Sequence, residues 1–122
     1  MRRTHTDLEA WRKGIELVKS IYQATASFPT EERYGLTNQL RRAAVSVPTN
    51  IAEGAARGSR KEFRQFLTIA RGSLSEVETL LVIATEVGHL DPAVQQDLMS
   101  SCSRVSALLT GLLKSLARTP NP

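Results

Sequence analysis

Residues 40–64, LRRAAVSVPTNIAEGAARGSRKEFR, decide how the whole chain is organised. This stretch holds six of the sixteen Lys and Arg residues, a proline inside a helical pattern and a Gly-Ser break. Apolar and small residues recur on one helix face, and their phase is kept across Pro48. Because proline lacks an N–H group and its ring crowds the carbonyl four residues back, we expect a kink at Pro48. The spacing therefore predicts one kinked helix over residues 36–57.

The dipeptide Gly58-Ser59 separates this helix from the next one. Gly58 suits the left-handed conformation that often follows a helix end. Ser59, followed three residues later by Glu62, has the pattern of a capping box, which opens a helix. A third helix is therefore predicted over residues 60–87. Its core-facing residues are Phe63, Phe66, Leu67, Ala70, Leu74, Val77, Leu81 and Ala84.

The segment before this stretch is also an amphipathic helix, predicted over residues 7–27. Thr6 or Asp7 is suited to its N-cap position. The helix should stop near its predicted end because Phe28-Pro29 disfavours helical geometry at the residue before proline. Its apolar stripe has the spacing of one helix face and consists of Leu8, Trp11, Ile15, Val18 and Tyr22, widened by Leu17, Ile21 and Ala24. Trp11 and Tyr22 are interpreted as core or subunit-contact residues rather than as a base-stacking platform.

The segment after residue 90 forms the last element. Asp91-Pro92 is typical of a helix start and opens a fourth helix over residues 92–117. The connections between helices two, three and four are short, and short connections make consecutive helices antiparallel. We therefore predict a single all-α domain, residues 1–122, folded as an antiparallel up-down-up-down four-helix bundle.

The positive charge is concentrated in the middle third of the chain. The net charge is +4, and residues 36–72 carry seven basic residues against two acidic ones. Residues 73–122 carry three basic and five acidic residues. Such polarity favours a basic face for an anionic partner, in particular nucleic acid. The alternative is a charged helix face that is merely solvated.

No residue pattern indicates catalysis, a cofactor or a metal site. His5 and His89 fall in a terminus and a loop, and no HxxxH, CxxC or Glu-x-x-His spacing is present. Cys102, the only cysteine, lies on the apolar face of the fourth helix and is interpreted as a core residue. We expect a protein that is not an enzyme.

Nothing in the sequence indicates a membrane partner. No apolar run approaches the roughly 18 residues that a membrane span needs. The N-terminus carries two arginines without the apolar segment of a signal peptide. A single cysteine is compatible with a reducing compartment. We expect a cytoplasmic protein.

Several motifs resemble one known family. They are QLRRAAVSVP at residues 39–48, NIAEG at residues 50–54 and GSLSE at residues 72–76, supported by Phe28-Pro29 and Gly58-Ser59. In these motifs the chain resembles the four-helix-bundle proteins encoded by intervening sequences within bacterial 23S ribosomal RNA genes. The resemblance covers the chain from Leu8 to about Leu90.

The resemblance carries implications that the residues alone do not. Members of this family form ring-shaped homopentamers with a central channel. The related accessory variability proteins of diversity-generating retroelements are basic pentamers that bind nucleic acid and a reverse transcriptase. The family does not supply an enzymatic activity. These properties are expectations for the present chain.

Two sets of residues follow from charge and position. Basic residues on and after the second helix are predicted to contact RNA or DNA: Arg41, Arg57, Arg60, Lys61, Arg64 and Arg71. Residues beside the apolar stripe, at the kink or on the facing edge of helix three are predicted to serve structure or assembly: Arg42, Ser46, Pro48, Asn50, Glu53, Gly54, Ser73 and Glu76. These groups can form a hydrogen-bonded cluster between helices or between subunits, and the candidate pairs are Glu76 with Arg42, or Glu53 with an arginine of a neighbouring chain.

The sequence thus leaves two functional hypotheses. In the first, a homo-oligomer binds nucleic acid through its basic surface, in the setting of an RNA or reverse-transcriptase complex. In the second, the protein is an interaction scaffold that binds another protein, and its basic residues only solubilise the surface or form ion pairs between subunits.

Overall fold

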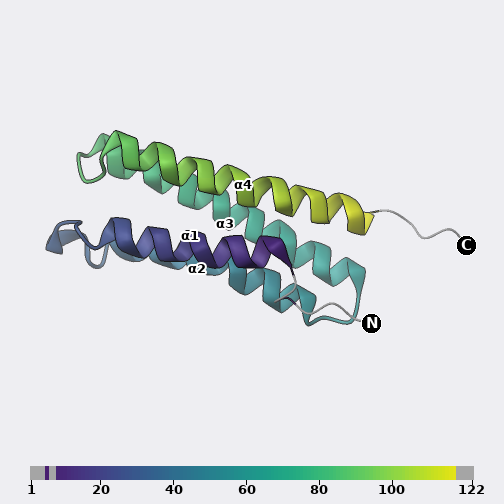
Figure 1. Ribbon diagram of the computed structural model, residues 1–122. Helices are drawn as coiled ribbons and strands as arrows, with labels where there is room; N and C mark the ends of the chain where they lie inside the picture. Colours follow the sequence, from purple (N-terminus) through teal and green to yellow (C-terminus); the bar gives the residue numbers. More distant parts are fainter. Residues whose placement is uncertain (1–4, 6–7, 118–122) are drawn as a thin grey trace, which may run out of the picture.

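A computed structural model of the protein describes residue 5 and residues 8–117 (Figure 1). These residues form four α-helices and one short 3₁₀ turn, and no strand occurs among them. The elements are α1 (Glu9–Thr25), η2 (Thr30–Glu32), α2 (Leu36–Ala55), α3 (Arg60–Glu86) and α4 (Pro92–Ala117). The expected all-α four-helix bundle is therefore confirmed, with α1 and α2 each two residues shorter at their carboxyl ends than the spacing indicated.

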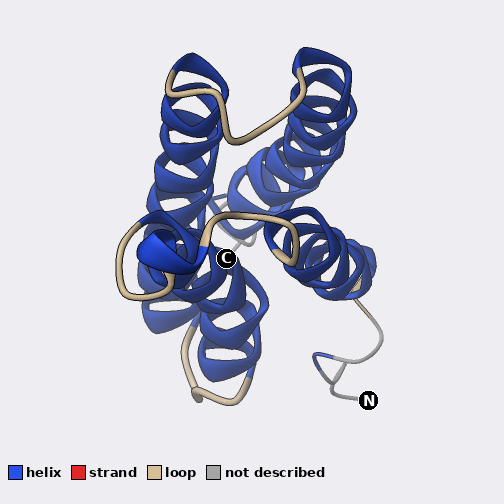
Figure 2. Ribbon diagram, turned by 90° about the vertical axis from the view of Figure 1, so that its left-hand side faces the viewer, coloured by secondary structure: helices blue, strands red, loops and turns tan. Residues whose placement is uncertain are grey.

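The helices alternate in direction. The α1–α2 and α3–α4 connections lie at one end of the molecule, and the α2–α3 connection lies at the other end (Figure 1). Around the bundle, α1 packs against α2 and α4, and α3 packs against the same two helices. The view turned by 90° shows the short loops that join the helices (Figure 2). This arrangement is the up-down-up-down topology that short connections require.

The core is built from aliphatic side chains of all four helices. Its largest fully buried members are Leu17, Ile21, Leu40, Val47, Ile51, Leu67, Leu74, Val77, Leu81, Cys102, Val105 and Leu109. Each such aliphatic side chain contributes roughly 1.5–3 kcal/mol of burial free energy, so the core is the main source of stability. Thr25 is the one buried polar residue within the described part of the chain. Its hydroxyl donates to the carbonyl of Ile21 at 2.8 Å and is thereby satisfied.

The buried side of α1 agrees with the sequence prediction only in part. Leu17 and Ile21 are buried in the core as predicted, whereas Ile15 and Tyr22 of the predicted apolar stripe are 44% and 43% exposed. Gly14 lies on the side of α1 that contacts α2, where an added Cβ would lie only 3.3 Å from the Cβ of Pro48.

The start of α1 also differs from the prediction. Leu8 occupies the N-cap position and makes no side-chain capping bond. Thr6 and Asp7, which the sequence suggested as caps, lie outside the described residues.

The second helix continues through Pro48 without interruption, as predicted. Pro48 is buried against α1, and the next two side chains bond back to the helix. Thr49 Oγ1 donates to the carbonyl of Val45 at 2.7 Å, and Asn50 Nδ2 donates to the carbonyl of Ser46 at 2.8 Å. The freed carbonyl is that of Ala44, four residues before Pro48, and these two bonds go to the next two carbonyls of the helix. The kink itself stays a prediction.

The α2–α3 turn uses different residues from those expected. Gly58 was predicted to be left-handed, but among the described residues only Gly88 has a positive φ, of 86°. The chain leaves α2 in a tight right-handed turn, in which the Arg57 N–H donates to the carbonyl of Gly54 at 3.1 Å. Ser59 caps α3 as predicted, since its Oγ accepts the N–H of Glu62 at 3.1 Å.

The α3–α4 turn behaves as the sequence indicated. After Gly88 the N–H groups of His89 and Leu90 both donate to the carbonyl of Ala84, which closes α3. Asp91 Oδ1 then accepts the N–H of Ala93 at 2.7 Å and opens α4.

Candidate functional site

The structure separates the six predicted nucleic-acid-binding residues into three places. Arg41 lies between α1 and α2, and Arg57 lies at the α2–α3 connection. The other four residues lie on α3. They are Arg60, Lys61, Arg64 and Arg71.

Arg41 is engaged within the chain. Its Nε donates to Thr25 Oγ1 at 2.9 Å, and one terminal nitrogen donates to the carbonyl of Tyr22 at 3.4 Å. Its guanidinium carbon lies 4.4 Å from the centroid of the Tyr22 ring. The cation therefore sits at the carboxyl end of α1, where it interacts favourably with the helix dipole, and it joins α1 to α2.

Arg57 also has contacts within the chain. A terminal nitrogen lies 3.8 Å from Glu53 Oε2, one helical turn earlier, and the guanidinium carbon lies 4.9 Å from the centroid of Phe66. Within this single chain, Glu53 therefore pairs with Arg57, which follows the end of the same helix. Both side chains of the pair are about half exposed, so the ion pair contributes little to stability.

Arg60 connects the start of α3 with the end of α4. A terminal nitrogen donates to the carbonyl of Ser115 at 3.1 Å. Carbonyls in the last turn of a helix lack intrahelical partners, and a cation there also complements the helix dipole. Arg60 thus acts as a cap of α4 supplied from outside that helix.

The remaining three cations form an exposed group that we call the basic stripe: Lys61, Arg64 and Arg71. None of the three side chains forms a hydrogen bond or ion pair with any residue that the structure describes. Arg64, Arg71 and Glu78 follow one another at intervals of seven residues and so lie on one side of α3.

Three of the polar residues predicted for structure or assembly form a chain of hydrogen bonds between α2 and α3. Ser46 Oγ lies 2.8 Å from Ser73 Oγ, and Asn50 Nδ2 donates to Ser46 Oγ at 2.9 Å. Arg42 and Glu76 line one surface cavity of about 340 Å³ beside these serines. No ion pair within 4.0 Å joins Arg42 to Glu76 among the described residues of the single chain. The two side chains extend into solvent instead.

Gly54 sets how closely α2 and α3 approach. A Cβ at this position would lie 2.7 Å from the Cβ of Phe66 and 2.9 Å from Cδ1 of Phe63. Such distances are shorter than van der Waals contact, so only glycine allows this packing without displacement of α3. The last glycine of the NIAEG block is therefore a packing residue.

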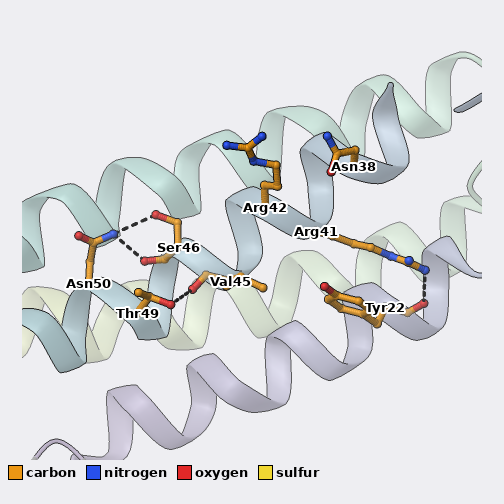
Figure 3. A pocket seen from close by; sticks show the side chains of 8 residues that line it. All are labelled: Tyr22, Asn38, Arg41, Arg42, Val45, Ser46, Thr49 and Asn50. Atoms are coloured by element: carbon orange, nitrogen blue, oxygen red, sulfur yellow. Dashed lines mark hydrogen bonds between the residues drawn. The ribbon is translucent and has the colours of Figure 1, made fainter. Parts of the chain in front are cut away.

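A larger open groove lies between α1 and α2 (Figure 3). Its volume is about 600 Å³, and its walls include Tyr22 of α1 and Asn38, Arg42 and Val45 of α2. Sequence reasoning did not identify this groove. Tyr22 was assigned to the apolar stripe of α1, and Asn38 belonged to no motif. The one signal in the sequence was the adjacent pair Arg41-Arg42. Its relation to Tyr22 becomes visible only when α1 and α2 are packed together.

The single cysteine is not a reactive thiol in this fold. Cys102 is buried in the core. Burial, and to a lesser extent the charge of Glu78, raise the pKa of the thiol from its ordinary value of 9.0 to about 12. The thiolate, which is the nucleophilic form, is therefore scarce at neutral pH.

Neither a metal cluster nor a membrane-spanning helix occurs in the described part of the chain. Residue 5 and residues 8–117 contain no group of three or more His, Cys, Asp or Glu that could hold a metal ion. None of the helices in the same residues is both long and apolar enough to cross a bilayer.

The fold and this geometry define a class of protein: an antiparallel four-helix bundle with a serine pair between α2 and α3 and exposed cations along α3. The chain belongs to the 23S rRNA-intervening sequence protein family, whose sequence profile matches residues 6–111. This match confirms the resemblance seen in the NIAEG and GSLSE blocks.

The comparison with solved structures agrees with the fold. A protein of unknown function from the S23 ribosomal protein family of Bacteroides thetaiotaomicron VPI-5482 superimposes with a TM-score of 0.77 at 20% sequence identity. The match covers 86% of this chain and 98% of that chain. No curated protein matches the chain significantly.

Proposed function

We propose that this protein is a homo-oligomeric bundle that binds nucleic acid through the basic stripe and has no enzymatic activity. The observation that carries the proposal is the exposure of Lys61, Arg64 and Arg71 without a partner among the described residues. Unpaired Lys and Arg side chains on one helix neutralise phosphates and release counterions, which drives sequence-independent binding. Arg41 and Arg60, whose donors are used within the chain, take a supporting structural role.

Self-association is the second part of the proposal. Ile69, Ile83 and Val87 lie on one side of α3 and are 51%, 40% and 54% exposed. Exposed aliphatic residues that recur along one helix side are typical of protein contacts. Because the family resemblance implies pentamers, we propose a homopentamer, in which every cation of the basic stripe would occur five times. An RNA complex or a reverse transcriptase is the proposed setting, and the cytoplasm is the proposed location.

A role in binding rather than catalysis is supported by the state of Cys102. The thiol is buried and carries a raised pKa of about 12. It is therefore unsuited to attack a substrate.

Filter binding with a structured RNA and with duplex DNA tests the proposal. We expect binding at about 50 mM salt that weakens steeply at about 200 mM, because each phosphate contact releases counterions. The double variant R64E/R71E should lose most of the affinity. The slope of log affinity against log salt concentration should fall by the amount expected for about two phosphate contacts. R33E/R104E, which reverses two exposed cations away from the basic stripe, is the matched control and should bind more tightly than R64E/R71E. Failure of the wild type to bind either nucleic acid at low salt would refute the proposal.

The alternative is a protein-interaction scaffold, and the exposed aliphatic side of α3 is the observation that favours it. In that case I69K would abolish capture of a protein partner from nuclease-treated extract, while R64E/R71E would leave the capture intact. The nucleic-acid proposal predicts instead that R64E/R71E abolishes binding of the partner, which is then a nucleic acid.

A further inference from the structure

The groove between α1 and α2 has the composition of a ligand site that the basic stripe does not explain. Its volume of about 600 Å³ is in the range of small-molecule sites. An aromatic ring, a cation and amide groups line it together, as Figure 3 shows. Each of these groups contributes a different type of contact.

The first group is a stacked pair on the α1 side of the groove. The Arg41 guanidinium lies over the Tyr22 ring, with 4.4 Å between the guanidinium carbon and the ring centroid. The bonds from Arg41 to Thr25 Oγ1 and to the Tyr22 carbonyl hold the guanidinium in this position. Tyr22 nevertheless stays 43% exposed. Aromatic rings and guanidinium planes are the surfaces on which unpaired nucleobases stack.

The second group is a cation with unused donors. Arg42 follows Arg41 directly and is exposed, and within the described chain it forms neither a hydrogen bond nor an ion pair. In Figure 3 its guanidinium points away from Tyr22. A guanidinium placed in this way suits the bidentate recognition of a phosphate.

The third group consists of amides along α2. Asn38 has no hydrogen-bonding partner among the described residues. The Asn50 amide nitrogen is used in two bonds to Ser46, which leaves its carbonyl oxygen as an acceptor. Amide side chains of this kind recognise the edges of bases when these are not paired.

We propose that the α1–α2 groove binds an unpaired nucleotide, with its base against the Arg41–Tyr22 pair and its phosphate at Arg42. This inference rests on the proposed nucleic-acid binding and deepens it. The basic stripe on α3 contacts the backbone of any nucleic acid, whereas the groove accepts only a base that is free to leave the helical stack. The protein therefore prefers single-stranded or looped segments to a continuous duplex.

Fluorescence anisotropy with a single-stranded RNA of about 12 nucleotides and with the duplex of the same sequence tests this inference. At about 50 mM salt, R42Q and Y22L should each weaken single-strand binding by about tenfold and leave duplex binding within about twofold. Y34L is the matched control for the aromatic change, because Tyr34 is 85% exposed and lies outside the groove. R64Q is the control for the change at the cation and should weaken the binding of single strand and duplex alike.

A second readout locates the ligand directly. Ultraviolet crosslinking of a 4-thiouridine oligonucleotide, followed by peptide mapping, should place the crosslink on the tryptic peptides that contain Tyr22 or Val45. Crosslinks confined to α3 would overturn the groove assignment. Y22F, which keeps the ring, should retain single-strand affinity within about twofold, and circular dichroism should show that each variant is folded.

The failures of the two proposals are distinguishable. Wild-type protein that binds neither ligand removes the proposed function and this inference together. If R42Q weakens the binding of single strand and duplex equally, only the assignment of the groove as a nucleotide site is overturned. A fall in assembly mass in R42Q and Y22L, with nucleotide affinity unchanged, would show that the groove is a protein contact and would also overturn the inference.

Discussion

Ser46 Oγ lies 2.8 Å from Ser73 Oγ and joins the middle of α2 to the middle of α3. Both residues belong to the motifs that place the chain in its family, and Asn50 completes the contact by donating to Ser46. A hydrogen bond between two half-buried hydroxyls contributes modestly to stability, but it requires one register between the helices. This pair is therefore a device for helix alignment.

The serine pair should be energetically coupled. S46A should lower the free energy of unfolding by about 1 kcal/mol, because Ser73 and Asn50 each lose a partner in a half-buried position. S73A should cost less, and the double variant S46A/S73A should cost clearly less than the sum of the two. Urea denaturation measures the three values. S75A, at an exposed position of α3, is the control, and strict additivity of the pair would contradict the coupling.

Gly54 and Gly72 should respond in opposite directions to the same substitution. G54A places a Cβ 2.7 Å from the Cβ of Phe66, so it should destabilise the fold by about 1–3 kcal/mol despite a better helix propensity. A Cβ added at Gly72, on the exposed side of α3, would meet no atom within 4 Å, so G72A should stabilise by about 0.5–1 kcal/mol. Thermal denaturation of both variants is the measurement. A G54A variant as stable as G72A would disprove the close approach of α2 and α3.

Glu32 should stabilise the end of the bundle where two loops meet. Its Oε1 accepts the N–H of Leu36 at the start of α2, and its Oε2 lies 3.0 Å from His89 Nε2 in the α3–α4 turn. E32A removes both contacts of a largely buried side chain and should cost about 1–2 kcal/mol. E31A, in the same turn but exposed, should change the stability by less than about 0.5 kcal/mol. Similar losses in E32A and E31A would rule out this role.

The contribution of His89 can be separated in a double-mutant cycle. H89A should lower stability in the wild type, and its effect should shrink in the E32A background, because the partner is already absent. Hydrogen exchange should show faster exchange of the Leu36 amide in E32A but not in H89A. The opposite ranking would mean that the carboxylate does not cap α2.

Cys102 should make the fold sensitive to alkaline pH. Because burial raises the pKa of the folded thiol from 9.0 to about 12, the unfolded state loses its proton first. The stabilisation is therefore complete below pH 9 and declines as the pH rises from 9 toward 12. Between about pH 8 and about pH 10.5 the wild type should lose about 2 kcal/mol more than C102A does, since other titrations are common to both. A thiol reagent should label the native protein slowly at about pH 8 and the unfolded protein rapidly, and equally rapid labelling would contradict the burial.

Much of the fold could be predicted from the sequence because its signals are local. The period of apolar residues indicated the four helices, and Ser59 and Asp91 marked where two of them start through bonds to residues two or three positions away. The continuity of α2 across Pro48 followed from the phase of its apolar face. These features depend on neighbours within one or two turns, so a linear pattern contains them.

The parts that could not be predicted depend on contacts between distant residues. The contact between α1 and α2 places Gly14 against Pro48, and no periodicity within α1 indicates this pairing. Gly58 carried a pattern typical of a left-handed position, yet the tight turn at Arg57 made that conformation unnecessary.

The candidate site shows the same division. Composition by itself determined that the charge is concentrated between residues 36 and 72, since counting needs no coordinates. Only the tertiary structure decided which cations are available. Arg41 and Arg60 bond to carbonyls at the carboxyl ends of α1 and α4, while the side chains of Arg42, Arg64 and Arg71 form no hydrogen bond or ion pair among the described residues. A guanidinium is drawn to unsatisfied carbonyls wherever the fold places them, and their position is fixed by helix packing across the bundle.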